Sequence, residues 1–233
     1  ILNYVPTIQK LTEELVAHWR PGTERDINRD MTDFMLRLTS TILFGIDDAE
    51  MAYRIGHMID HWVHMNHELG MGAFVANQDI ANRYGDLLEF AGLLEAEIKG
   101  MISQRKSNPT GNDALSLMIS AHDSEGSISD KELIGQAALM FGAAHLTTAH
   151  SLAWTLFLLA EHPSVMGELH QELKTKLNGG FPTTEQVDRL QCTERVVKES
   201  RRVLPASSYS QRVSAIPTQL GPFALAPGAG IVF

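Results

Sequence analysis

Small residues and hydroxyl side chains share the middle of one long uncharged segment. Gly142-Ala-Ala144 is followed by Leu146 and by two threonines, Thr147 and Thr148. Small side chains let a flat or bulky group approach a helix closely, and the Thr147 hydroxyl can bond the carbonyl of Ala143, one turn earlier. The spacing alone favours ordinary helix–helix packing through small residues just as strongly as the approach of such a group. The segment is therefore either a site of close approach or a packing seam.

A row of histidines is the second candidate. Four of them occupy positions i, i+4, i+7 and i+10, within about a third of a helix circumference: His57, His61, His64 and His67. Two histidines one turn apart can chelate zinc or copper. We favour the alternative of a partly exposed helix that is rich in histidine, because no carboxylate or cysteine set closes a site from elsewhere.

Glu199 and Arg202 are three residues apart, a spacing that pairs opposite charges on one helix face. On spacing alone, such a pair is expected to be exposed and to contribute a fraction of a kcal/mol to stability. Arg212, ten residues later, is on the same reasoning a solvated surface charge. The sequence contains no G-x-x-x-x-G-K-[ST] phosphate loop, no G-x-G-x-x-G nucleotide fingerprint and no G-x-S-x-G nucleophile turn, which excludes those classes of site.

Composition narrows the class of protein. The 233 residues are 44% hydrophobic, enough for a sizeable core, and 19 basic against 28 acidic residues give a net charge of −9. An acidic balance argues against nucleic acid as the main partner and against a basic membrane-surface module. The single cysteine, Cys192, excludes an internal disulfide and a multi-cysteine zinc site. No secretory signal pattern occurs, and we expect a cytoplasmic protein.

Proline and apolar periodicity predict a mainly α fold with a small C-terminal β element. Four of the nine prolines follow Arg202, where the short apolar runs 223–225 and 230–233 suit strands. Long proline-free stretches upstream permit long helices. Helices are predicted at about 6–19, 28–44, 49–69, 80–106, 112–121, 129–161, 164–177 and 190–203.

The longest predicted helix is a central spine. Ser129 and Glu132 have capping-box spacing, and no charged residue occurs from 133 to 160. The helix should end before Pro163, after a length of about 50 Å. A membrane span has this length too, but His145 and His150 lie at the middle, where hydrocarbon tolerates polar groups least. We therefore expect a buried helix of a soluble domain and no membrane span.

The order of several short blocks resembles the cytochrome P-450 family. The segment 143–154 is similar to that family's A-G-x-[D/E]-T-[T/S] oxygen-binding helix, and 197–202, followed by Pro205, is similar to its E-x-x-R helix. The segments 43–47 and 221–228 are similar to the end of an earlier family helix and to a G-y-x-I-P-x-G turn. Each block is weak alone, but the ordered set is strong and covers essentially the entire chain.

The resemblance implies that residues 1–233 are part of a single cytochrome P-450 domain. It also implies that the family's N-terminal part and its Gly-rich F-x-x-G-x-x-x-C-x-G loop, which carries the haem-ligand cysteine, are not in this chain. Cys192 precedes the E-x-x-R block, so the ligand role is not assigned to it. We expect the cysteine ligand of the haem outside this chain, and the chain alone to be inactive.

Residue roles follow from the same resemblance. Thr147 takes the position of the family's oxygen-activation threonine, whereas Leu146 replaces the usual carboxylate and cannot relay a proton. Proton delivery is then expected through Thr147 and ordered water, or through a polar group of the substrate. The Glu199–Arg202 pair becomes a buried structural brace. Residues expected against the haem are Ala143, Ala144 and Thr148, with Arg212 at a propionate, and residues expected around the substrate are Leu139, Gly142, Ser207 and Ser208.

The implied activity is that of a haem-dependent monooxygenase. Such an enzyme inserts one oxygen atom of O₂ into an apolar small molecule, with electrons from a separate ferredoxin- or flavoprotein-type donor. The main alternative is a non-catalytic binding or scaffold protein with the same helical fold and no haem. A third possibility is a metal-binding protein that uses the face of His57 to His67.

Overall fold

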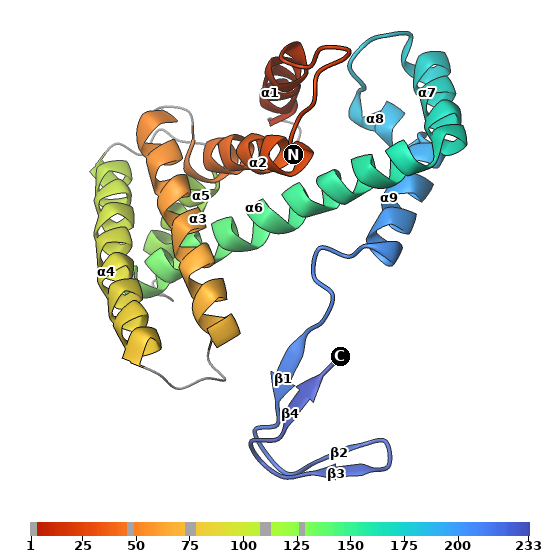
Figure 1. The fold of residues 1–233 in the computed structure, drawn as a ribbon. Coiled ribbons are helices and arrows are strands. Elements are labelled where there is room, and N and C mark those ends of the chain that lie inside the picture. The colour runs from red at the N-terminus through yellow and green to blue at the C-terminus, as the bar shows by residue number, and fades with distance from the viewer. Residues whose placement is uncertain (1–3, 46–48, 73–77, 108–112, 126–128) are drawn as a thin grey trace.

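The computed structural model describes residues 4–45, 49–72, 78–107, 113–125 and 129–233. Helices make up most of the chain and short strands follow them (Figure 1). The helices are α1 (Val5–Ala17), α2 (Ile27–Phe44), α3 (Ala49–Gly72), α4 (Gln78–Ser107), α5 (Ala114–Glu125), α6 (Asp130–Glu161), α7 (Pro163–Leu177), α8 (Thr184–Val187) and α9 (Gln191–Val203). The strands are β1 (Gln211–Val213), β2 (Thr218–Leu220), β3 (Phe223–Leu225) and β4 (Gly230–Val232).

The predicted fold class is confirmed. Every predicted long helix is present, with ends that differ from the prediction by no more than four residues. The single-turn helix α8 was not predicted; it is held by a capping box between Thr183 and Gln186. The apolar runs in the tail form β3 and β4, whereas β1 and β2 were missed.

Helix α6 begins at the predicted capping box. The Glu132 amide donates to Ser129 Oγ at 3.2 Å, and the Ser129 amide donates to the Glu132 carboxylate at 2.6 Å. The helix ends as predicted before Pro163 and runs across the whole helical body (Figure 1). Within the described part of the chain, no helix combines the length and the apolar content that crossing a bilayer requires.

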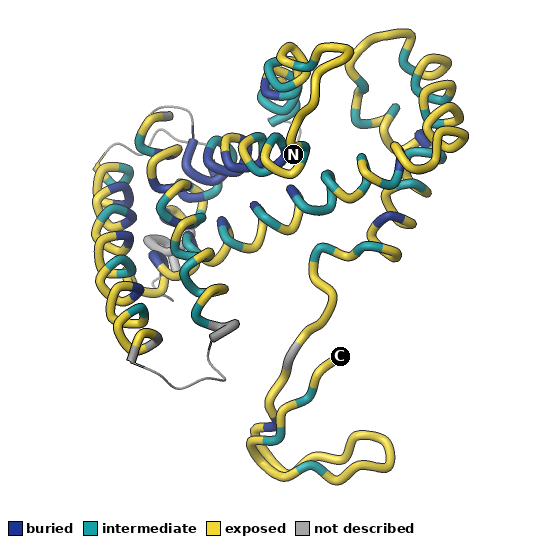
Figure 2. Tube along the Cα trace, viewed as in Figure 1, coloured by how far each residue is buried: buried dark blue, intermediate teal, exposed yellow. Residues whose placement is uncertain are grey.

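Only one side of α6 is buried, which corrects the prediction of a buried helix. Its buried residues recur mainly at every fourth position and form a narrow stripe (Figure 2): Leu133, Ile134, Ala137, Phe141, His145, Ala149 and Leu159. Apolar side chains on other sides remain in solvent, and Leu139 is 64% exposed. The sequence shows that residues 133–160 of α6 carry no charge, but it does not show which sides of the helix the described residues cover.

Two apolar clusters hold the helices together. The larger cluster joins α2, α3, α4, α5 and α6, and within it the rings of Phe44 and Phe141 stack with centroids 5.7 Å apart. Gly56 lets α3 approach this cluster, because a Cβ atom there would lie 2.9 Å from the Phe141 ring. The smaller cluster joins α1, α2 and α6 through residues that include Met31 and Ala149.

A buried ion pair fastens the C-terminal end of α2. Gly45 ends this helix with a φ of +83°, and a Cβ atom there would lie 2.8 Å from both Arg105 Nη2 and Asp113 Oδ2. Arg105 pairs with Asp113 at 3.1 Å and also donates to the carbonyl of Phe44. Asp113 accepts from the amide and the hydroxyl of Ser116, each at 2.9 Å, and so caps α5. One carboxylate therefore connects three helices.

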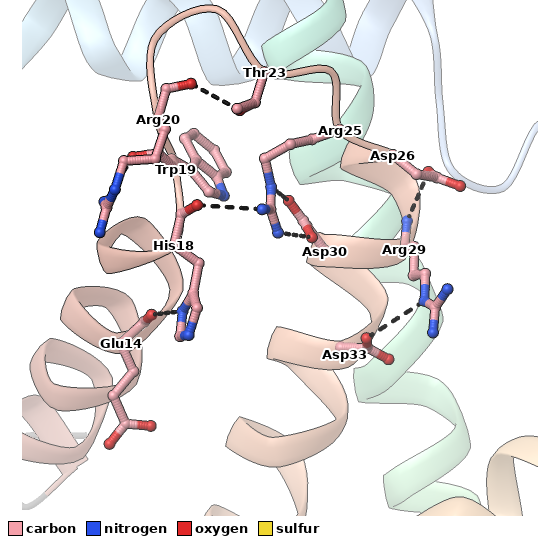
Figure 3. A network of polar contacts seen from close by, with 10 residues as sticks. All are labelled: Glu14, His18, Trp19, Arg20, Thr23, Arg25, Asp26, Arg29, Asp30 and Asp33. Carbon is pink, nitrogen blue, oxygen red and sulfur yellow. Dashed lines mark hydrogen bonds and ion pairs between the residues drawn. The ribbon is translucent and has the colours of Figure 1, made fainter.

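Polar contacts tie α1 to the start of α2 (Figure 3). The Arg25 guanidinium donates twice to the Asp30 carboxylate, each time at 2.7 Å, and once to the carbonyl of His18 at 3.3 Å. This bidentate bond lowers the pKa of Asp30 and raises the pKa of Arg25. Asp26 caps α2 by accepting from the amide of Arg29 at 3.0 Å. The loop between the two helices is thus fixed at both ends.

The strands form two antiparallel pairs beyond α9. In one pair Arg212 of β1 lies opposite Ile231 of β4, and in the other Gln219 of β2 lies opposite Ala224 of β3. The chain that leads from α9 to β1 carries both pairs away from the helical body (Figure 1). Ser214 is buried at their junction and donates to the carbonyl of Ala226 at 2.6 Å.

We predict that Asp113→Ala lowers the free energy of unfolding by about 3–5 kcal/mol, because it leaves the Arg105 guanidinium buried without its carboxylate. Glu97→Ala is the matched control, since Glu97 pairs with Arg54 where the side chains are 40% and 52% exposed, and should cost less than ~1 kcal/mol. Urea unfolding of both variants measures the difference. Equal losses in the two variants would contradict the assigned role of the buried pair.

Candidate functional site

A large cleft lies between α6, α9 and the segment that follows α9. Its volume is about 810 Å³. Helix α6 contributes Thr147, Thr148, Ser151, Leu152 and Thr155; α9 contributes Val197, Lys198, Arg201 and Arg202; the next segment contributes Pro205, Ala206 and Ser207.

The α6 wall of this cleft is uncharged and carries regularly spaced hydroxyls. Thr147 Oγ1 donates to the carbonyl of Ala143 at 2.7 Å, as predicted. Ser151 Oγ donates to the carbonyl of Thr147 at 2.8 Å, and Thr155 Oγ1 donates to that of Ser151 at 2.7 Å. Because each proton points back along the helix, the hydroxyl oxygens keep lone pairs that can accept bonds from groups in the cleft.

The α9 wall is cationic. Lys198, Arg201 and Arg202 all line the cleft. The Lys198 ammonium donates to Glu194 at 2.5 Å, and the Arg202 guanidinium donates twice to Glu199, at 2.6 and 2.8 Å. The bonds from Arg202 lower the pKa of Glu199, and the pKa of Arg202 is raised in return. An uncharged wall therefore faces a wall that carries three cations, two of which are paired with carboxylates.

The structure brings together only part of the predicted set. Thr147, Thr148, Arg202 and Ser207 line the cleft. The predicted residues outside its lining are Leu139, Gly142, Ala143, Ala144, Glu199, Ser208 and Arg212. Ala143 and Ala144 lie exposed on α6, one turn before Thr147 and Thr148. The small-residue segment of the helix is therefore exposed to solvent. Gly142 instead faces α3, since a Cβ atom there would lie 3.6 Å from Val63.

The Glu199–Arg202 ion pair is present, but its expected burial is not. The side chains are 61% and 71% exposed, because no described residue packs over them. Arg212 also lies exposed, on β1, which extends away from the helices (Figure 1). Its role at a haem propionate remains a prediction.

Sequence reasoning missed Ser151, Thr155, Lys198 and Arg201. The hydroxyls were visible in the sequence as a repeat of four residues from Thr147, which places them on one helix face. The two cations carried no such signal, since nothing in their spacing says that α9 lies against α6.

The histidine row does not form a metal site. The His57 ring contacts the ring of Tyr53, and the His61 ring contacts that of Phe90 on α4. Across the residues that the structure describes, no group of three or more His, Cys, Asp or Glu side chains could hold a metal ion. The row is the exposed side of α3 and its contact with α4.

One member of that row belongs to a polar cluster that was not predicted. Asp60 Oδ1 is buried without a hydrogen-bond partner, 3.6 Å from the Nδ1 atoms of both His64 and His145. His145 Nε2 lies 3.3 Å from the carbonyl of Thr32 on α2. Burial lowers the pKa of His145 more than Asp60 raises it, so the imidazole is neutral at pH 7. The cluster lies where α3 and α2 pack against α6, on the side opposite the cleft.

A second cavity of about 340 Å³ lies between α6, α7 and α9. Its titratable lining includes His162, Glu168, Cys192 and Glu199. Thr155 lines both cavities. Cys192, the single cysteine of the chain, therefore faces away from the large cleft and supplies no ligand there.

The large cleft fits the haem that the resemblance implies. An apolar disc with two carboxylates needs a neutral surface beside its ring and cations at its edge. Thr147, Thr148 and Leu152 provide the neutral surface, and Arg201 and Lys198 provide cations on the facing wall. The thiolate ligand has no candidate among the described residues of this cleft.

Glu172 of α7 fixes the position of α9. Its carboxylate accepts from the amides of Cys192 and Thr193, both at 3.0 Å, and from the Thr193 hydroxyl at 3.1 Å. These donors belong to the first turn of α9, whose amides have no partner within the helix. The cap was not predicted, because it joins residues twenty positions apart.

Comparison with known proteins places the chain in a family. The family model described as Cytochrome P450 matches residues 1–233. The chain is 28% identical over 239 residues to cyclooctat-9-en-7-ol 5-monooxygenase of Streptomyces melanosporofaciens, covering 100% of this chain and 52% of that protein. It is 25% identical over 241 residues to pentalenene oxygenase of Streptomyces avermitilis, covering 99% and 52%. The chain thus spans about half the length of these relatives.

Solved structures share the fold. The heme domain of cytochrome P450DA superposes with a TM-score of 0.79 at 23% identity, covering 98% of this chain and 52% of that one. Retinoic acid bound cyanobacterial CYP120A1 superposes with a TM-score of 0.80 at 20% identity, covering 99% and 51%. These similarities confirm the predicted helical fold.

We predict that Glu172→Gln destabilises the protein at pH 7 and that this loss shrinks in acid. The bond from the Cys192 amide, followed by that from Thr193, lowers the pKa of Glu172 from 4.5 to about 2. Between these values the unfolded chain binds more protons, so the stabilisation is complete above about pH 4.5 and is lost as the pH falls towards about 2. Urea unfolding of both proteins at pH 7 and at about pH 3 measures this.

Lys176→Met serves as the control for the role of Glu172. It removes the ammonium, which lies 3.1 Å from Glu172 and also donates to the carbonyl of Arg189, but leaves the α9 donors in place. It should therefore lower the stability less than Glu172→Gln. An equal loss would show that the bonds of the Lys176 ammonium, and not the helix cap, carry the stabilisation.

Proposed function

The chain belongs to the cytochrome P450 family, and from this we propose that it forms part of a haem-dependent monooxygenase of apolar small molecules. The observation that carries the proposal is the exposed hydroxyl of Thr147 on the neutral wall of an 810 Å³ cleft whose facing wall is cationic. A scaffold protein without cofactor has no need of this combination.

Haem, when bound, would supply the oxidation, in which O₂ with two electrons and two protons gives one oxygen atom to the substrate and one to water. This chain supplies the surroundings. Arg201 and Lys198 would hold carboxylates of the cofactor, and Thr148 and Leu152 would pack against its ring. Thr147 would orient a hydrogen bond toward the reacting oxygen, because its own proton can leave the carbonyl of Ala143 for a stronger acceptor.

The proposed substrate is a hydrocarbon-rich molecule. Two relatives, cyclooctat-9-en-7-ol 5-monooxygenase and pentalenene oxygenase, are named for the oxygenation of an alkenol and of an alkene. Apolar side chains in the cleft lining, among them Leu152 and Val197, support the same class. We further propose that the electrons come from a separate ferredoxin- or flavoprotein-type donor.

We expect the full-length protein to bind haem and to show the family's red-shifted Soret band when it is reduced under carbon monoxide. The band reports an iron with a thiolate ligand, which a scaffold protein lacks. Absorbance spectra of the purified protein, with and without carbon monoxide, measure it. A folded full-length protein that takes up no haem would overturn the proposed function in favour of a non-catalytic scaffold.

Thr147→Ala should lower product formation per electron pair about tenfold and raise peroxide release correspondingly. This is below the ~10²–10⁴ range of general acid–base catalysis, because water can partly replace the hydroxyl. Parallel assays of product and peroxide measure the partition. Thr147→Ser keeps the hydroxyl, and its ratio of product to peroxide should stay near that of the wild type. A Thr147→Ala variant with the wild-type ratio would rule out the assigned role.

A further inference from the structure

Two hydroxyls connect the large cleft with the second cavity. Thr155 of α6 and Ser200 of α9 are 2.7 Å apart, and either can be the donor. Thr155 lines both cavities, whereas Ser200 lines only the second and is 3% exposed. The pair is therefore a polar bridge in the partition between two spaces.

Each of these hydroxyls has a second acceptor. Thr155 Oγ1 reaches the carbonyl of Ser151 at 2.7 Å, and Ser200 Oγ reaches that of Val197 at 3.1 Å. If Ser200 donates to Thr155, the Thr155 proton goes to Ser151; if Thr155 donates to Ser200, the Ser200 proton goes to Val197. Both arrangements leave every donor bonded, so the direction of the pair can reverse at little cost, as a proton relay requires.

The two sides of the bridge differ in chemistry. On the α6 wall of the large cleft the polar groups are hydroxyls, and Leu146 stands where the resembled helix has a carboxylate. The second cavity contains groups that exchange protons with water, among them His162 and Glu168. A proton source thus lies on one side of the pair and Thr147 on the other.

Ser151 continues the bridge toward Thr147. Successive hydroxyls in this series are four residues apart, which is a rise of about 6 Å along the helix. One bridging water spans such a gap with two ordinary hydrogen bonds. Ser151 and Thr155 both line the cleft, and each hydroxyl oxygen can accept from these waters.

We propose that the Thr155–Ser200 pair is the proton entry to the cleft, passing protons from the second cavity along Ser151 to Thr147. This inference rests on the proposed monooxygenase function. The balanced reaction is R–H + O₂ + 2 e⁻ + 2 H⁺ → R–OH + H₂O, with electrons from the separate donor. The relay supplies only the protons, since each hydroxyl that gives up one proton receives another. Thr155 and Ser200 are thus positioning residues that act through Thr147.

The test uses the haem-loaded full-length enzyme and variants that differ by single hydroxyls. Thr155→Val and Ser200→Ala remove one hydroxyl each with little change in volume. Thr155→Ser keeps the hydroxyl at position 155. Thr175→Val is the matched control, because Thr175 makes the same bond to a carbonyl four residues earlier, at 2.7 Å, on exposed α7. The variants are compared by peroxide released per electron pair, by the solvent deuterium isotope effect on product formation, and by thermal unfolding.

The valine and alanine variants should each release at least threefold more peroxide and show a larger isotope effect. The double variant should be no worse than either single variant, because both interrupt one path. Thr155→Ser and Thr175→Val should match the wild type. A purely structural bond would lower the unfolding midpoint without changing the isotope effect, and that result in Thr155→Val, or in Ser200→Ala if the former does not fold, overturns the relay.

Thermal unfolding without haem provides a readout independent of activity. It compares the wild type, Thr155→Val, Ser200→Ala and the double variant. If the bond exists, the effects of Thr155→Val and Ser200→Ala are not additive. Additive effects overturn the inference. A wild-type enzyme that lacks the carbon monoxide band overturns the proposed function and the relay with it, whereas a normal band with unchanged coupling in both variants overturns the relay alone.

Discussion

The register of α6 sets both the core and the cleft. Residues that pack inward recur every fourth position, among them Phe141, His145 and Ala149. The hydroxyls of the cleft recur with the same period but are displaced by two residues, as in Thr147 and Ser151. Two residues correspond to about 200° of rotation, so the two sets lie on opposite sides of one helix. Packing of the buried residues in the core therefore orients the hydroxyls toward the cleft.

The cleft also depends on how α9 is held. Glu172 caps the first turn of α9 from α7, and Ser200 bonds to Thr155 of α6 about two turns later. With α9 held at these two points, Lys198, Arg201 and Arg202 line the same cleft as the uncharged wall of α6. The electrostatic contrast of the site thus arises from two tertiary hydrogen-bonding contacts, and neither of them adds a charge to the α6 wall.

Local spacing predicted what lies within one helix, and little of what lies between helices. The capping box at Ser129, the bond from Thr147 to Ala143 and the Glu199–Arg202 pair all join residues three or four apart, and all are present. The exposure of that pair and the open side of α6 were not predicted, because burial depends on which elements pack nearby. The cap by Glu172 joins distant residues, for which spacing offers no signal.

The distribution of ionisable groups around α6 explains why both its core side and its cleft side lack charged residues. On the buried side and on the cleft-facing side of α6, a charge would lie in the core or beside the bound molecule, and both positions require a compensating partner. The chain meets this constraint by carrying no charged residue from 133 to 160. The neutral imidazole of His145 faces Asp60 on the core side, and hydroxyls face the cleft. Groups that can exchange protons lie behind Thr155 and Ser200, where they lead to the cleft without charging its wall.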